Sequence, residues 1–174
     1  MEDKIYQTKE EKDYVEYVNK HITRVRNSYN ERGREIAIVL GLSESEIEDL
    51  VNRIANHDQS KYSSEEMEGY RQNFNPAPGE KPNKELFEKA WKHHYENNDH
   101  HPEFWKGKDM PKVAIAELIC DWESMSRTFG GNPLEYFEKN KDKKKKAMSE
   151  NTFNILCEVL PKLYNINQDL RDWK

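Results

Sequence analysis

Apolar residues recur every three or four positions along most of the chain, which is the spacing of one face of an α-helix. The first such stripe spans residues 14–25, and the apolar signal continues through residues 36–40. Gly41 follows directly, and glycine favours the left-handed conformation that ends helices. The pattern therefore predicts a long N-terminal helix that stops at Gly41.

Two capping boxes, in which a serine is followed three residues later by a glutamate, predict further helix starts. Ser43 with Glu46 precedes an apolar face that ends near Ile54, and Ser63 with Glu66 lies just downstream. The proline-rich stretch 75–82 predicts a loop.

Three more helices are expected beyond this loop, over residues 83–97, 111–130 and 149–163. Residues 99–109 are expected to form an ordered loop, and the lysine-rich run 141–146 favours a solvated connector over a nucleic-acid patch. The patterns together predict an all-α protein, a single compact bundle of about six to eight helices. Residues 1–145 would form the main helical domain, and residues 146–174 a C-terminal helix packed on it.

Composition agrees with thin amphipathic helices, since 34% of residues are hydrophobic and 35% are charged. The net charge of −5 arises from 28 basic and 33 acidic residues that are largely interleaved. A duplex nucleic acid requires a concentrated basic face, so we expect no such partner. A small phosphorylated ligand remains compatible with this charge.

Membrane and redox signals are equally sparse. The longest apolar run, 36–40, is too short to span a bilayer, and residues 1–6 contain no apolar signal-peptide region. Cys120 and Cys157 match no redox or zinc motif and are interpreted as buried free thiols. We therefore expect a cytoplasmic protein without a membrane partner.

Several histidines and aspartates fall on the predicted inward helix faces. His21 lies three residues after Val18, and His57 and Asp58 lie three and four after Ile54. His94 and Asp121 occupy equivalent positions on two further helices. Burying such groups without partners costs several kcal/mol, so they are expected to satisfy one another around a cation. A buried hydrogen-bond network without metal is the alternative.

The order of these residues, His21, His57-Asp58 and Asp121, resembles the H…HD…D signature of the HD phosphohydrolase superfamily, over residues 21–126. The resemblance implies an HD-domain-like helical bundle that binds one or two divalent transition metal ions. Imidazole and carboxylate donors without thiolate suit Mn, Fe, Co, Ni or Zn.

Two further elements are similar to the HD-GYP branch: residues 56–61, in which Lys61 occupies the lysine of HDxGK, and residues 100–103, which match HHE. Ser60 replaces the glycine and no GYP triplet follows, so cyclic-dinucleotide specificity is not carried over. The HDxSK, HHPE and Cys-Asp-Trp motifs also look like a family of uncharacterised bacterial and phage proteins.

The resemblance assigns roles residue by residue. The expected metal ligands are His21, His57, Asp58, His94, His101 and Asp121, surrounded by Glu103, His93 and His100. His93 and His100 are neighbours that could exchange roles with His94 and His101. Asp58 is the expected catalytic residue, and Lys61 and Arg24 are the expected phosphate-binding residues, Lys61 also aiding catalysis.

The implied function is hydrolysis of a nucleotide or other small phosphoester by a metal-activated water. Two alternatives stay open. Some HD-like proteins hold a di-iron centre and oxygenate their substrates, and the same ligands serve that chemistry. A non-catalytic, metal-stabilised module that binds a nucleotide or a protein is the other.

Overall fold

The computed structural model describes residues 8–165, which form eight α-helices, two short 3-10 helices and no strand. The α-helices are α1 (Lys9–Leu40), α2 (Glu44–Ala55), α3 (Ser64–Phe74), α4 (Lys84–Asn97), α5 (Lys112–Phe129), α6 (Pro133–Lys139), α7 (Lys141–Ala147) and α8 (Glu150–Tyr164). The 3-10 helices are η1 (Gln59–Tyr62) and η2 (Pro102–Trp105). The expected all-α helical bundle is thus confirmed. The predictions for residues 1–7 and 166–174 lie outside the described residues.

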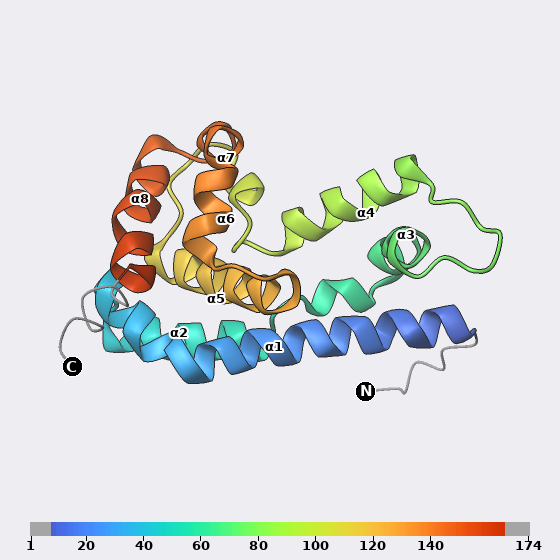
Figure 1. Ribbon diagram of the computed structural model, residues 1–174, viewed down its shortest axis with the longest axis horizontal. Helices are drawn as coiled ribbons and strands as arrows, with labels where there is room; N and C mark the ends of the chain where they lie inside the picture. The colour runs from blue at the N-terminus through green and yellow to red at the C-terminus, as the bar shows by residue number, and fades with distance from the viewer. Residues whose placement is uncertain (1–7, 166–174) are drawn as a thin grey trace.

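Helix α1 runs the length of the molecule, below α3 at one end and α5 at the other (Figure 1). It begins at a capping box in which Thr8 and Glu11 each accept a hydrogen bond from the other's backbone N–H. It ends at Gly41, whose φ of 65° is the left-handed conformation expected from the sequence. One helix therefore supports both ends of the bundle.

Two hydrophobic clusters pack against opposite ends of α1. The larger one joins α1, α2, α5, α6 and α8 through residues that include Leu50, Ile115 and Leu160. The smaller one, which we call the α3–α4 cluster, consists of Tyr14, Val18, Ile22, Tyr70 and Ala90. His21 lies near the point where these clusters meet, since it directly precedes Ile22, the last α1 residue of the smaller cluster, and lies one turn before Val25, the first of the larger one.

Helices α3 and α4 approach one another closely at Gly69. A Cβ atom there would lie 2.6 Å from the Leu86 carbonyl oxygen and 2.7 Å from the Ala90 Cβ. Only glycine permits this distance without a shift of one helix. The contact fixes how α4 presents its histidines to the rest of the bundle.

Three local predictions need correction. The helix before the HD pair ends at Ala55, so His57 and Asp58 lie in a turn and not on a helix face. Ser63 begins α3 without a side-chain capping bond, and the Glu66 carboxylate, the other half of the expected capping box, contacts histidines instead. The lysine-rich run forms the short helix α7 and not an irregular connector.

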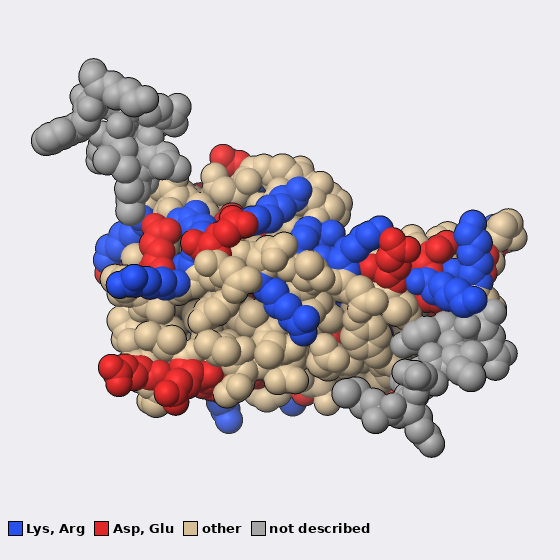
Figure 2. Space-filling model, turned by 90° about the horizontal axis from the view of Figure 1, so that it is seen from below, with Lys and Arg blue, Asp and Glu red and all other residues tan. Residues whose placement is uncertain are grey.

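Helix α8 packs against α1 and α6 and contributes Phe153, Leu156 and Leu160 to the larger cluster. No helix among residues 8–165 has the length and apolar character needed to cross a membrane. On the face shown in Figure 2, basic and acidic side chains are interleaved and form no continuous basic surface.

Candidate metal centre

Seven side chains from four parts of the chain converge in the interior. α1 supplies His21, the turn after α2 supplies His57 and Asp58, and α5 supplies Asp121. The end of α4 and the following turn supply His94, His100 and His101. We call this set of seven the inner cluster. Asp58 has a φ of 57°, a left-handed conformation that aspartate adopts more readily than most residues.

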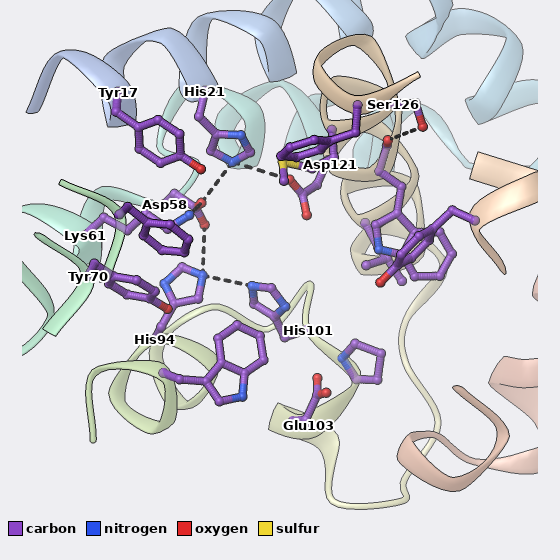
Figure 3. A pocket seen from close by; sticks show the side chains of 18 of the residues that line it. Tyr17, His21, Asp58, Lys61, Tyr70, His94, His101, Glu103, Asp121 and Ser126 are labelled. Carbon is purple, nitrogen blue, oxygen red and sulfur yellow. Dashed lines mark hydrogen bonds and ion pairs between the residues drawn. The ribbon is translucent and has the colours of Figure 1, made fainter. Parts of the chain in front are cut away.

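Asp58 lies at the centre of the inner cluster (Figure 3). Its Oδ2 is 3.1 Å from His21 Nε2 and 3.5 Å from His57 Nε2. Its Oδ1 is 3.4 Å from His94 Nε2 and 3.6 Å from His100 Nε2. Each oxygen therefore faces a different group of imidazoles.

The two groups are completed by one further residue each. Asp121 Oδ1 lies 3.3 Å from His21 Nε2 and 3.8 Å from His57 Nε2. His101 Nε2 lies 2.9 Å from His94 Nε2. One group thus comprises His21, His57, Asp121 and Asp58 Oδ2, and the other comprises His94, His100, His101 and Asp58 Oδ1.

Two buried glutamates orient the histidine rings from outside the inner cluster. Glu117 Oε1 accepts hydrogen bonds from Nδ1 of His57 at 2.8 Å and of His100 at 3.3 Å. Glu66 Oε2 accepts from His94 Nδ1 at 2.9 Å. Because each ring donates through Nδ1, its Nε2 carries the lone pair that a metal needs.

Neither glutamate was expected from the sequence to lie beside the site. Glu66 was assigned to a capping box. Glu117 is the one charged residue within the buried run 113–120 and lies one helical turn before Asp121. That spacing places both carboxylates on the same side of α5. It is the sequence signal by which Glu117 could have been recognised.

Three buried atoms of the inner cluster have no hydrogen-bond partner: His57 Nε2, His100 Nε2 and Asp58 Oδ1. A buried polar atom left unpaired costs about 1–3 kcal/mol. The two imidazole nitrogens lie 3.5 Å and 3.6 Å from the two oxygens of the Asp58 carboxylate. The donor set therefore fits one or two cations of the kind that imidazole and carboxylate bind.

The charge states also suit a cation. Burial lowers the pKa of His21, His94 and His101 and favours the neutral imidazole. Burial alone would raise the pKa of Asp58, but the charges of His57 and Lys61 hold it well below its usual range. His57 differs: burial opposes its protonation, yet Asp58 and Glu117 raise its pKa.

A pocket of about 520 Å³ opens onto the inner cluster. In Figure 3, Tyr17, Lys61 and Tyr70 lie on one side of the histidines and Ser126 on the other. Lys61 Nζ is 2.6 Å from Asp58 Oδ2, and although burial opposes its charge, Asp58 raises its pKa. The pocket thus combines the ammonium group of Lys61, the buried donors of the inner cluster and aromatic walls.

All six expected ligands meet in the inner cluster, and their binding of metal stays a prediction. His100 was expected in the surrounding shell, but the structure places its Nε2 inside the cluster because Glu117 holds its Nδ1. His93 does lie outside, with Nδ1 2.8 Å from Glu66.

Two expected residues lie away from the inner cluster. Arg24 follows His21 by one turn of α1 but does not line the pocket. Glu103 lines the pocket, yet no hydrogen bond joins its carboxylate to a histidine within the described chain.

Fold and site together define an all-α protein with a buried histidine–carboxylate centre. The model of a family of unknown function, DUF5662, matches residues 10–162, and the chain belongs to this family. This agrees with the expectation of an uncharacterised family. Neither a curated protein nor a solved structure matches the chain.

Proposed function

We propose that this protein is a metal-dependent phosphohydrolase that acts on a nucleotide or another small phosphoester. The observation that carries the proposal is the inner cluster, which contains three unpaired buried atoms. Five of its members, His21, Asp58, His94, His101 and Asp121, line a pocket that also contains Lys61. The order of the donors along the chain, which resembles the HD superfamily, supports the same reaction.

A divalent ion such as Mn, Co, Ni, Zn or Fe, bound by these donors, would supply a water acidified to a pKa of about 7. The chain's own contribution is orientation. Glu66 and Glu117 hold the imidazoles with Nε2 inward, and Asp58 presents one oxygen to each group. This sharing of Asp58 favours two ions over one.

Lys61 would bind the phosphoryl oxygens. Its ammonium group lies beside Asp58 at the pocket wall, and its side chain is 18% exposed, so a ligand can reach it. A fixed positive charge in a partly dry pocket stabilises the charge that develops on a phosphoryl group in the transition state. The aromatic side chains of Tyr17, Tyr70 and Trp91 in the same wall suit a planar base.

The metal site is tested by measuring metal content in His57→Ala and Asp58→Asn variants. Asparagine tolerates the left-handed conformation of residue 58, so the second variant removes charge without adding strain. Both should lose at least one ion per chain. His93→Ala, which removes a histidine outside the inner cluster, should retain the wild-type stoichiometry. Undiminished metal in both test variants would exclude this centre.

The reaction is tested on protein loaded separately with Mn, Co and Ni, by phosphate or nucleoside release from nucleoside monophosphates, triphosphates and cyclic nucleotides. Turnover that is lost in Asp58→Asn supports the proposal. No turnover in fully loaded protein would favour a non-catalytic binding module. Tight iron binding with a mixed-valent EPR signal and an oxygenated product would favour the di-iron oxygenase.

A further inference from the structure

The lysine-rich helix α7 reaches the same pocket as the inner cluster. Lys143 and Lys144 both line the pocket, together with Tyr136 from α6 and Trp122 from α5. Trp122 directly follows Asp121, a member of the inner cluster. A continuous wall therefore leads from the inner cluster to two lysines that the proposed hydrolysis does not use.

Aromatic rings hold Lys144 in place. Its Nζ lies 4.9 Å from the centroid of the Trp122 ring and 5.2 Å from that of Tyr136. Such contacts restrict a side chain that is otherwise flexible, and they leave its hydrogen-bond donors free. The charge is thus positioned before any ligand arrives.

The two lysines also lack acidic partners. Elsewhere on the surface, lysines pair with glutamates three or four residues away, as Lys141 does with Glu138 and Lys162 with Glu158. Within residues 8–165, neither Lys143 nor Lys144 forms an ion pair with a carboxylate. The lysine-rich helix therefore presents uncompensated positive charge to the pocket.

The wall between the lysines and the inner cluster is mainly apolar. Leu118, Met125 and Phe129 line it beside Trp122. A ligand that spans this wall would need a neutral or apolar middle segment. The pocket thus has a charged binding group at each end and a hydrophobic surface between them.

We propose that Lys143 and Lys144 form a second anion subsite, so that the substrate is a phosphoester with another anionic group at its far end. This inference rests on the proposed function, because one phosphate is taken to lie at the inner cluster. It assigns specificity to α7 and catalysis to the inner cluster.

The test measures equilibrium binding by calorimetry to Mn-loaded protein. The probes are linear alkane bisphosphates with two to ten carbons and alkyl monophosphates of equal length. At the spacer length that matches the pocket, the bisphosphate should bind about tenfold more tightly, which corresponds to about 1.4 kcal/mol. Lys144→Gln, which keeps the side-chain stem over Trp122, should abolish most of this preference and leave monophosphate affinity unchanged.

Lys146→Ala is the matched control, since it removes the same charge from the same helix at a position outside the pocket wall. It should keep the preference for bisphosphates. Equal affinity for both probe series at every length in the wild type, or an unaltered preference in a Lys143→Gln/Lys144→Gln double variant, would overturn the proposal. A preference for bisphosphates that depends on these lysines, in a protein that releases no phosphate, would support the anion subsite. It would contradict only the proposed hydrolase activity.

Discussion

At the scale of single residues, the site depends on carboxylates that would not touch a metal themselves. Glu117 accepts hydrogen bonds from His57 and His100, and Arg53 donates to its other oxygen at 3.3 Å. Arg53 in turn forms a two-point ion pair with Asp99. This chain of contacts fixes the rings of two expected ligands from behind.

Replacement of Glu117 by glutamine should weaken metal binding roughly 10- to 100-fold, the usual effect of losing a carboxylate that orients ligating histidines. The neutral amide no longer specifies which ring nitrogen of His57 carries the proton. Competition with a chromophoric chelator measures the affinity.

Glu103→Gln is the control for this prediction, because Glu103 lines the pocket without a hydrogen bond to a histidine. It should bind metal as the wild type does. If the Glu117 variant also does so, Glu117 has no role in orienting the ligands.

Residue identity and order were sufficient to select six of the seven members of the inner cluster. They were insufficient to separate His100 from His101, since adjacent residues in a loop have no helical phase. Both rings point into the inner cluster, and the contact between His100 Nδ1 and Glu117 orients His100 there.

At the scale of elements, helix starts and stops were predictable where capping and glycine decide them. Gly41 and Ser43 act through their own side chains or backbone, so a sequence contains the whole signal. Ser63 and Glu66 have the same spacing, but tertiary contacts with His93 and His94 outcompete the local bond. Helix α7 packs against its neighbours through Lys144, whose ammonium group lies over Trp122 of α5 and Tyr136 of α6.

Gly69→Ala tests how the α3–α4 contact supports the site. The added Cβ would meet backbone of α4 at 2.6 Å, so the helices must separate, at a cost of about 1–3 kcal/mol. The same shift moves Glu66 away from His94, which should lower the metal content of the group containing His94. Urea unfolding and metal analysis measure the two effects.

Glu65→Ala provides the comparison, because residue 65 lies on the exposed side of the same helix. This variant should match the wild type in both its free energy of unfolding and its metal content. Loss of stability in the Gly69 variant with metal content intact would uncouple helix packing from the site.

The loop before α4 contains a pH-dependent contact. Arg71 forms a two-point ion pair with Glu80, and its hydrogen bonds, with that from the Ala77 N–H, lower the pKa of Glu80 from about 4.5 to about 2. A carboxylate with a lowered pKa in the folded state contributes stability above its unfolded pKa and loses it as pH falls toward the folded value.

The Glu80→Gln variant should therefore have a lower melting temperature than the wild type at pH 7. The difference in melting temperature should shrink as the pH falls from 4.5 to about 2. Thermal unfolding of both proteins across this range measures it. A difference that stays constant with pH would show that the ion pair does not stabilise the fold.

At the scale of the whole molecule, the inner cluster lies between two hydrophobic clusters of unequal size. Helices α5 and α8 belong to the larger cluster, and α3 and α4 belong to the smaller one. Helix α1 passes through both, and η2 joins the end of α4 to the segment that leads to α5. Cations bound by the group of His21 and Asp121 and by the group of His94, which share Asp58, would join the two clusters directly.

Removal of the metal should consequently destabilise the two ends unequally. A ligand at 1,000 times its Kd stabilises the folded state by about 4 kcal/mol, and a chelator would remove this contribution. The α3–α4 cluster has few buried side chains of its own, so hydrogen exchange should accelerate most in α3 and α4 and least in α5. Asp58→Asn, which lacks the bridging carboxylate, should already exchange like the chelated wild type and respond little to chelator. Equal acceleration in all helices would mean that the ion stabilises the bundle as one unit, and that the two clusters are coupled through α1 alone.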